Sequence, residues 1–299
     1  MKNIIVITGG AGFIGSNLIK LLVRKTKYKI ISIDNYSTGT IRNHIKNKRI
    51  KYIRGENKNI FKILSEKRKK IKTIFHFGEF SRIFQSFQDI DKCYYSNMLG
   101  TFEVVKFCSN NKIRIIYSAS SSKFGNQGKD EHLSPYSWSK SKNIEFIENF
   151  NNWYGLKYEI LYFYNVYGPG QIKNSKMAAV IGIFERQYLQ GRSLTVVRPG
   201  TQKRDFTHVN DIVNGCYLAF LKGKNNHYLL GTKKTYTVLE IAKMFESKIK
   251  MLPRRPGERL SSFHTTNRSF VDLGYKAKVN IKDYIKDFIF KEKKNYKNS

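Results

Sequence analysis

Short apolar runs alternate along the chain with longer segments that carry apolar residues on one helical face. The runs have the length and the β-branched residues of strands, and they cover 3–8, 29–33, 50–54, 73–77, 113–117 and 159–163. Helical spacing of apolar positions predicts helices at 13–25, 83–109 and 136–154. Strands that alternate with helices in this way predict a parallel sheet with helices on both faces.

The rhythm changes after Gly168-Pro169-Gly170. From there the chain is rich in helical patterns, with short strand candidates at 194–197 and 228–230. We therefore expect an α/β fold with a doubly wound sheet domain at 1–166 and a smaller mixed α/β domain at 167–299. We also expect the chain to cross between the two domains more than once.

The first predicted strand leads into a glycine-rich loop, Thr8-Gly9-Gly10-Ala11-Gly12-Phe13-Ile14-Gly15, which opens a predicted helix. Glycines in this context let the backbone approach a pyrophosphate and let the helix pack close to the strand, as in Rossmann-type dinucleotide sites. The second predicted strand is followed by Asp34, 19 residues after Gly15. A carboxylate there accepts hydrogen bonds from ribose hydroxyls and repels a 2′-phosphate, which favours NAD over NADP, and a turn residue is the less favoured alternative for Asp34.

Tyr136 and Lys140 lie one turn apart on one face of the predicted helix at 136–154. The preceding strand ends in Ser118, Ser120 and further serines, and ligands of doubly wound sheets bind at the carboxyl ends of strands. A phenol has an ordinary pKa near 10, so it needs a nearby cation to act as a base at neutral pH, and Lys140 supplies that charge. Ser120 would donate a hydrogen bond to the substrate oxygen while Tyr136 takes the proton. An ordinary amphipathic helix remains the alternative.

The composition changes this picture in one respect, because the formal net charge is +33. Such a charge makes nucleic acid a partner to consider. The lysines are scattered, however, and no nucleic-acid-binding motif is present, so we prefer to interpret them as residues of solvated surface faces. The field would also attract an anionic small substrate. The three cysteines have no zinc or disulfide spacing, and no apolar stretch has the length of a membrane span. We expect a cytoplasmic protein with no metal site.

The motifs together resemble the extended short-chain dehydrogenase/reductase family, in particular its NAD-dependent nucleotide-sugar epimerase/dehydratase group. The resemblance covers nearly the whole chain. It is carried by the loop at 8–15, Asp34-Asn35, His76-Phe77-Gly78, Asn97, Gly100-Thr101, the segment 118–125, Tyr136 and Lys140, the segments 164–170 and 204–211, and Arg255-Pro256-Gly257-Glu258.

This resemblance implies NAD as the cofactor and a nucleotide sugar, such as a UDP-sugar, as the substrate. The implied cofactor-binding residues are Gly9, Gly12, Phe13, Ile14, Gly15, Asp34, Asn35, Phe77, Gly78, Asn97, Ser118, Tyr136, Lys140 and Tyr164. The implied substrate-binding residues are Ser120, Ser121, Ser122, Tyr136, Asn165, Arg204, Arg255 and Glu258, of which Ser120, Tyr136 and Lys140 are also the implied catalytic set. Guanidinium groups suit phosphate oxygens, although Arg204 and Arg255 could also be surface residues. A homodimer is implied as well, through a four-helix bundle built from 83–109 and 136–154.

The reaction turns on the residues that follow Ser120. Dehydratases and decarboxylases of the group have an acidic residue there, whereas this chain has Ser121 and Ser122. The resemblance therefore implies 4-epimerisation of UDP-glucose and UDP-galactose or an N-acetyl analogue, by oxidation at C4 and return of hydride. A 4,6-dehydratase or reductase of the same family, and a noncatalytic basic binding protein, stay open. Glu79 departs from the family pattern and could meet a basic group of the substrate or pair with Arg82.

Overall fold

The computed structural model describes residues 2–128, 131–257, 261 and 266–297, and a seven-stranded sheet forms its large lobe. The strand order is β11-β6-β5-β4-β1-β2-β3, and every neighbouring pair is parallel. The strands are β1 Ile4–Thr8, β2 Lys29–Asp34, β3 Ile50–Arg54, β4 Ile71–His76, β5 Arg114–Ser120, β6 Tyr158–Phe163 and β11 His227–Leu230. This is the Rossmann-type doubly wound order with a seventh strand at one edge, so the predicted fold class is confirmed.

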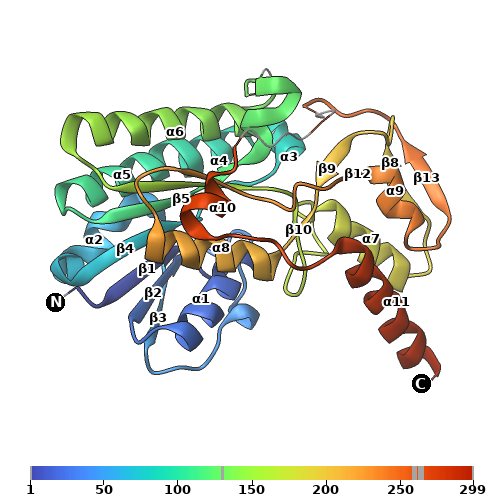
Figure 1. Cartoon of the computed structure of the whole chain (residues 1–299), viewed down its shortest axis with the longest axis horizontal. Helices are drawn as coiled ribbons and strands as arrows, with labels where there is room; N and C mark the ends of the chain where they lie inside the picture. Colours follow the sequence, from blue (N-terminus) through green and yellow to red (C-terminus); the bar gives the residue numbers. More distant parts are fainter. Residues whose placement is uncertain (1, 129–130, 258–260, 262–265, 298–299) are drawn as a thin grey trace.

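Helices cover both faces of the sheet (Figure 1). On one face lie α1 Phe13–Lys25 and α8 Val209–Lys222, and on the other lie α2 Ile60–Leu64, α5 Gly100–Asn110 and α6 Pro135–Tyr154. Alternate residues of β1 belong to separate cores, with Ile4 and Val6 in one and Ile5 and Ile7 in the other. Because both faces are buried, β1 is a continuous apolar run.

The predicted strands of the large lobe begin and end within three residues of the observed ones, but the helix predicted at 83–109 is broken. It consists of α3 Ile83–Gln88, α4 Ile90–Tyr94, a π-helical turn at Tyr95–Leu99, and α5. Within the π turn, the Asn97 side chain bonds the backbone of Phe80, which apolar spacing does not reveal. The strand predicted at 228–230, in the sequence of the expected second domain, is part of β11 and pairs with β6 in the large sheet.

The smaller lobe has its own core, which includes Tyr167, Phe184, Phe206 and Phe245. Three two-stranded pairs lie beyond the large sheet, namely β7 Val166–Tyr167 with β10 Thr207–His208, β8 Leu194–Val197 with β13 Ile249–Leu252, and β9 Lys203–Asp205 with β12 Thr235–Thr237. The helices that pack there are α7 Val180–Leu189, α9 Val238–Lys243 and α11 Ile281–Lys297. The short α10 Arg268–Leu273 packs instead against α8 and β11, and the end of α11 projects from the molecule (Figure 1).

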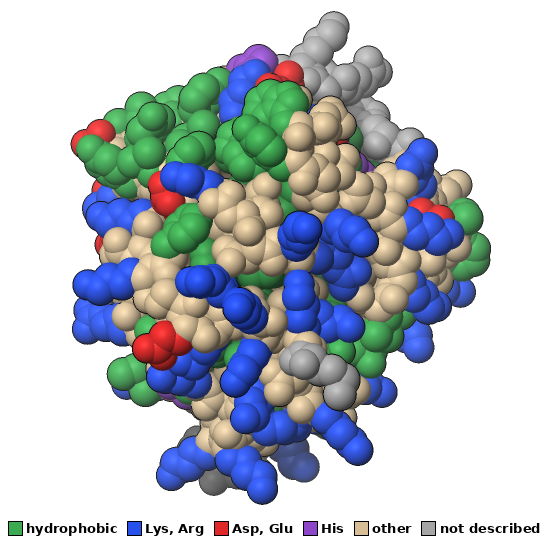
Figure 2. Space-filling view, turned by 90° about the vertical axis from the view of Figure 1, so that its left-hand side faces the viewer, with side chains coloured by type: hydrophobic (Ala, Val, Ile, Leu, Met, Phe, Trp, Pro, Cys, Tyr) green, Lys and Arg blue, Asp and Glu red, His purple; other side chains and the backbone are tan. Residues whose placement is uncertain are grey.

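Basic side chains outnumber acidic ones, with 55 Lys and Arg against 22 Asp and Glu in the sequence. Figure 2 views the molecule from the side of the large lobe and shows Lys and Arg over much of that face, with hydrophobic side chains gathered near its top. Within the described part of the chain, no helix is long and apolar enough to cross a bilayer. The structure describes all three cysteines, Cys93, Cys108 and Cys216, as buried free thiols.

Candidate active site

The glycine loop forms a narrow backbone cradle between β1 and α1. Gly9 has a φ of 71°, and a Cβ built there would lie 2.8 Å from the backbone nitrogen of Gly78. A Cβ at Gly15 would lie 2.2 Å from the carbonyl oxygen of Gly9. Gly12 precedes α1 with extended backbone, and Phe13 and Ile14 begin the helix. Only glycine fits such spacing, and the resulting cradle at a helix N-terminus fits the pyrophosphate of a dinucleotide.

Asp34 ends β2 and holds the glycine loop in place. Its Oδ2 accepts the N–H of Ala11 at 2.9 Å, and its Oδ1 accepts the N–H of Tyr36 at 2.8 Å. Burial raises the pKa of Asp34, and hydrogen bonds from backbone N–H groups partly oppose that rise. Asp34 therefore holds a turn, one of its two predicted roles, while its remaining lone pairs leave room for ribose hydroxyls. Asn35 is exposed, and its Oδ1 accepts the N–H of Ser37 at 3.0 Å.

The end of β4 lies against the same loop. The Oγ1 of Thr8 accepts the N–H groups of Phe77 and Gly78 at 3.2 and 3.1 Å. The same oxygen lies 2.7 Å from Nδ1 of His76, whose Nε2 lies 2.9 Å from Oγ1 of Thr101. Burial lowers the pKa of His76 to about 4, so the ring is neutral at physiological pH. These contacts fix the position of Phe77 and Gly78 beside the cradle.

Helix α6 carries the predicted Tyr136 and Lys140. Ser134 caps its N-terminus by accepting the N–H of Ser137, and Pro135 occupies the first turn, so Tyr136 stands at the start of the helix. The Nζ of Lys140 donates to the carbonyl oxygen of Ser118 at 2.5 Å, and the residue is 5% exposed. Lys140 is thereby fixed against the carboxyl end of β5, where the sequence predicted it.

Tyr136 is half-buried, and its backbone N–H donates to Oγ of Ser86 at 3.2 Å. Its hydroxyl has no hydrogen-bond partner among the described residues, but the guanidinium of Arg82 is near enough to interact with it electrostatically. Arg82 is itself anchored through Nε to the carbonyl oxygen of Met177 at 2.6 Å. The phenol is therefore open to a ligand and faces positive charge.

The serine segment begins on β5 and turns beyond it. The Oγ of Ser118 donates to the carbonyl oxygen of His76 at 3.0 Å, and the Oγ of Ser120 accepts the N–H of Ser122 at 3.2 Å. The Oγ of Ser122 is buried and has no partner within the described chain. Ser121 is also buried. An orphaned buried hydroxyl beside Ser120 is a feature that a polar ligand would satisfy.

Two predicted cofactor residues are enclosed by protein. Asn97 is fully buried, and its side chain bonds the N–H of Phe80 at 2.7 Å and Oγ of Ser139 at 3.0 Å. Hydrogen bonds within the protein therefore use both the oxygen and the nitrogen of its side-chain amide. Tyr164 follows β6 and is also fully buried.

The predicted substrate residues come from both lobes. The carbonyl oxygen of Asn165 accepts the N–H of Thr207 at 3.2 Å, and Arg204 lies on β9 with 7% of its surface exposed. The guanidinium of Arg255 lies 5.2 Å from the ring centre of Phe84 on α3. Glu258 falls outside the described residues. Asp205, next to Arg204, accepts the N–H groups of Thr232 and Lys233, so it holds the smaller lobe together.

Sequence reasoning missed the environment of Glu79. The predicted pairing with Arg82 is not observed, because the Glu79 carboxylate binds Lys140 and is buried away from solvent. It also accepts hydrogen bonds from Thr101, Tyr117 and Asn143. The one sequence signal was an unexpected carboxylate at the end of β4, a site where strand ends converge.

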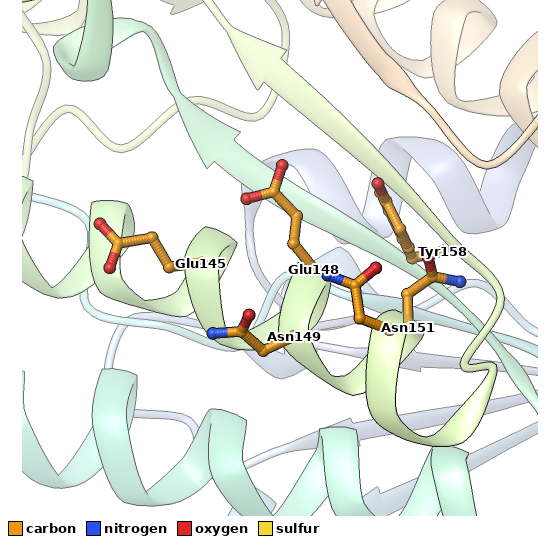
Figure 3. A pocket seen from close by; sticks show the side chains of 6 residues that line it. Glu145, Glu148, Asn149, Asn151 and Tyr158 are labelled. Atoms are coloured by element: carbon orange, nitrogen blue, oxygen red, sulfur yellow. The ribbon is translucent and has the colours of Figure 1, made fainter.

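A cavity of about 410 Å³ lies elsewhere in the described structure. It is lined by Glu145, Glu148, Asn149, Asn151, Asn152 and Tyr158. Figure 3 shows these side chains projecting from α6 and from the start of β6, and the set includes none of the predicted cofactor or substrate residues. No group of three potential metal ligands occurs in the part of the chain that the structure describes.

Comparison with known proteins agrees with this geometry. The model of the NAD dependent epimerase/dehydratase family matches residues 5–231. A putative UDP-glucose 4-epimerase of Methanocaldococcus jannaschii is 30% identical, over 94% of this chain and 96% of that protein. The crystal structure of UDP-glucose 4-epimerase from Thermotoga maritima with UDP-glucose superposes with a TM-score of 0.87 at 26% identity, covering 98% of this chain and 99% of that one.

A further comparison concerns the cofactor. UDP-glucuronic acid 4-epimerase from Bacillus cereus, solved with UDP-glucuronic acid and NAD, has a TM-score of 0.85 at 25% identity, covering 96% of this chain and 99% of that one. The glycine cradle and Asp34 fit the same dinucleotide here. The cofactor is NAD, and the chain belongs to the NAD-dependent epimerase/dehydratase family.

Proposed function

We propose that this protein catalyses the 4-epimerisation of a nucleotide sugar, with UDP-glucose and UDP-galactose or their N-acetyl analogues as the first substrates to test. The observation that carries the proposal is the position of Lys140, buried against the carbonyl of Ser118 one turn after the half-buried Tyr136. A phenol and a fixed ammonium at the carboxyl end of a central strand form an acid–base pair where a dinucleotide is held.

In the proposed mechanism Tyr136 takes the proton of the C4 hydroxyl, and the Lys140 ammonium favours the phenolate form. Ser120 donates a hydrogen bond to the same sugar oxygen and keeps it within reach of Tyr136. NAD, held by the cradle at Gly9, Gly12 and Gly15 together with Asp34, supplies reversible hydride acceptance at the sugar carbon. Rotation of the 4-keto sugar turns its opposite face to the returning hydride, which would bond to C4 while Tyr136 gives its proton back to the C4 oxygen, so that the hydroxyl of the epimer forms.

We assign substrate recognition to Ser121, Ser122, Asn165, Arg204 and Arg255. The orphaned hydroxyl of Ser122 supports contact with the sugar, and the guanidinium groups of Arg204 and Arg255 suit a diphosphate. In this proposal residues 1–166 hold NAD and residues 167–299 supply most contacts to the nucleotide, with β11 returning to the large sheet. The predicted contact of Glu258 with the nucleoside ribose stays a prediction.

The structure offers an argument against the rival elimination reaction. A 4,6-dehydratase needs an acid and a base for a β-hydroxyl and a carbon-bound proton, and Ser121 and Ser122 cannot serve. Glu79 is the carboxylate that contacts Lys140, but four donors already occupy it, so it is unavailable as a proton carrier. Epimerisation, which needs a single proton acceptor, therefore fits the site better than dehydration.

The experiment is a panel of nucleotide sugars, incubated with the purified protein without added cofactor, with products identified by NMR. The proposal predicts the 4-epimer of a UDP-sugar. A 4-keto-6-deoxy product would identify a dehydratase, and net consumption of added NADH would identify a reductase. Binding of DNA that weakens with salt, with no turnover of any sugar, would support the noncatalytic basic protein.

We also propose that two copies associate through a four-helix bundle made by α4, the π turn, α5 and α6 from each. The support is a set of exposed apolar side chains on these elements, namely Ile90, Tyr94, Tyr95, Leu99, Phe102, Trp138, Trp153 and Tyr154. Large exposed apolar patches mark interaction surfaces, and a two-fold axis would bury this one against itself.

We also assign the enzyme to the cytoplasm. The three cysteines that the structure describes are buried free thiols, which fits a reducing compartment.

A further inference from the structure

Glu79 is a buried carboxylate that binds Lys140, one member of the proposed catalytic pair. Its side chain is 1% exposed and follows the carboxyl end of β4. Oε1 accepts hydrogen bonds from Oγ1 of Thr101 at 2.8 Å, the hydroxyl of Tyr117 at 3.0 Å and Nδ2 of Asn143 at 2.9 Å, while Oε2 accepts from Nζ of Lys140. The four donors come from α5, β5 and α6, so Glu79 joins three elements of the large lobe.

The hydrogen bonds indicate that Glu79 is ionised. Nδ2 of Asn143 and Nζ of Lys140 can only donate, so Oε1 and Oε2 each accept at least one hydrogen bond, as both oxygens of an ionised carboxylate do. Among the described residues, the titratable groups that face Glu79 are Lys140, His76, Tyr117 and Cys93. Burial lowers the pKa of His76 to about 4, raises the pKa of Cys93 to about 11, and raises the pKa of Tyr117 well above its usual value. Lys140 is therefore the charged partner.

A directed chain of hydrogen bonds connects this pair to the dinucleotide cradle. Thr8 accepts two backbone N–H groups, so its hydroxyl hydrogen is donated to Nδ1 of His76. The neutral ring then carries its hydrogen on Nε2 and donates to Thr101, which in turn donates to Glu79. The carboxylate is thus fixed from the side of β1 as well as from α6.

We propose that Glu79 is a positioning residue that acts through Lys140, holding its ammonium group in place beside Ser118 and Tyr136 in a site that excludes water. Lys140 donates two of its three N–H bonds to Glu79 and Ser118, and its Nζ lies 4.8 Å from the ring centre of Tyr117. A buried ammonium without a counter-charge favours its neutral form, and a neutral Lys140 would no longer favour the Tyr136 phenolate. The role assigned to Lys140 rests on the proposed function.

The test measures the ionisation of Tyr136 without any sugar. The chain has 19 tyrosines, so the signal of Tyr136 is isolated by subtracting the ultraviolet absorption spectrum of the Tyr136→Phe variant at each pH. In Glu79→Gln, the phenolate is expected to appear at a pH higher by about one unit, equivalent to a tenfold change in its ionisation constant. Glu79→Asp keeps the carboxylate but places it one methylene further from Lys140. We expect this variant to give a smaller shift in the same direction. Either variant decides the matter if the other does not fold.

Activity supplies the second readout. In Glu79→Gln, the acid limb of the pH profile of kcat is expected to move to higher pH. At neutral pH, kcat for the epimerised sugar is expected to fall tenfold or more, while KM changes little. Because the phenolate titration needs no substrate, a failed epimerase assay would count against the proposed function without deciding the role of Glu79. In the Lys140→Met background, Glu79→Gln is expected to leave the Tyr136 titration unchanged and to raise the thermal unfolding midpoint.

The matched control is Glu159→Gln. Glu159 is also 1% exposed, lies on β6, and faces Arg114 at 3.8 Å, away from Tyr136. Glu159→Gln is expected to lower the stability of the protein without changing the pH at which Tyr136 ionises. An unmoved titration in a folded Glu79 variant, a shift to lower pH, or an equal shift in Glu159→Gln would overturn the proposal.

Discussion

At the scale of single residues, the proposed mechanism depends most on Tyr136. Tyr136→Phe removes the proton acceptor but keeps the ring, so turnover is expected to fall by about 10²- to 10⁴-fold while NAD stays bound. Steady-state kinetics and the absorbance of bound cofactor measure the two effects. Tyr154→Phe is the control, because Tyr154 lies on the same helix with 66% of its surface exposed. A Tyr136→Phe enzyme with most of its activity would exclude Tyr136 as the base.

Asp34 makes a second prediction, about the choice between cofactors. Asp34→Asn keeps an oxygen for the N–H of Ala11 but removes the negative charge, so NAD affinity is expected to fall and discrimination against NADP to weaken, each by roughly tenfold or more. Dissociation constants of the cofactor-free protein for NAD and NADP give the ratio. An unchanged ratio would mean that Asp34 serves the loop alone.

Some residues were predictable because their signal is local. The glycines at 9, 12 and 15 and the Tyr136–Lys140 pair are recognised by short spacings that adjoin a strand or a helix. The partner of Glu79 was not predictable, because Lys140 lies 61 residues further on and a pattern does not say which side chains of neighbouring strand ends meet. Arg82 is the nearest cation along the chain, yet its guanidinium donates a hydrogen bond to the carbonyl oxygen of Met177 and not to Glu79.

At the scale of elements, the link between β4 and α5 predicts an acid-sensitive fold. His76 on β4 bonds Thr101 on α5, and burial lowers its pKa to about 4 from the 6.5 of an exposed ring. The unfolded chain therefore binds a proton that the folded chain refuses, so stability is lost as pH falls from about 6.5 towards 4, by up to about 3 kcal/mol.

Denaturant unfolding at pH 7 and pH 5 measures this loss. His76→Gln should show a smaller decrease between the two values than the unmodified protein, even though it starts less stable. His132→Gln, which changes a histidine whose side chain is 59% exposed, should keep the full decrease. Equal decreases in all three proteins would show that His76 carries no such linkage.

Strands were the elements that the sequence predicted best, because continuous β-branched runs suit a sheet buried on both faces. The helix predicted at 83–109 failed at Asp89 and at the π turn. Apolar spacing continues through both, and it does not reveal that Asn97 in the π turn bonds the backbone of Phe80, which is a tertiary contact.

At the scale of the whole molecule, the exposed aromatic surface of α4–α6 predicts a dimer. Light scattering should give twice the 35.0 kDa of one chain. Tyr95→Glu places a charge on this surface and should weaken association by about 2 kcal/mol or more, as for an aromatic residue central to an interface. Phe270→Glu is the control, since Phe270 is 61% exposed against 60% for Tyr95 but lies on α10. A monomer at micromolar concentration would contradict the prediction.

The order of the strands could be predicted only in part. Alternating strands and helices indicate the parallel sheet, but β11 joins its edge after 63 intervening residues, some of which form parts of the smaller lobe. Composition does not predict the order of the strands. The net charge of +33 is a property of the surface and not of the fold, and Figure 2 shows Lys and Arg side chains over one face.

The central claim, that Tyr136 and Lys140 support reversible oxidation of a sugar at C4, is tested most directly with UDP-glucose that carries deuterium at C4. The account predicts that NMR finds the deuterium still at C4 of the UDP-galactose product, because the hydride returns to the carbon it left. Deuterium at C6 of a 4-keto-6-deoxy sugar, or deuterium replaced by solvent hydrogen at C4, would contradict it.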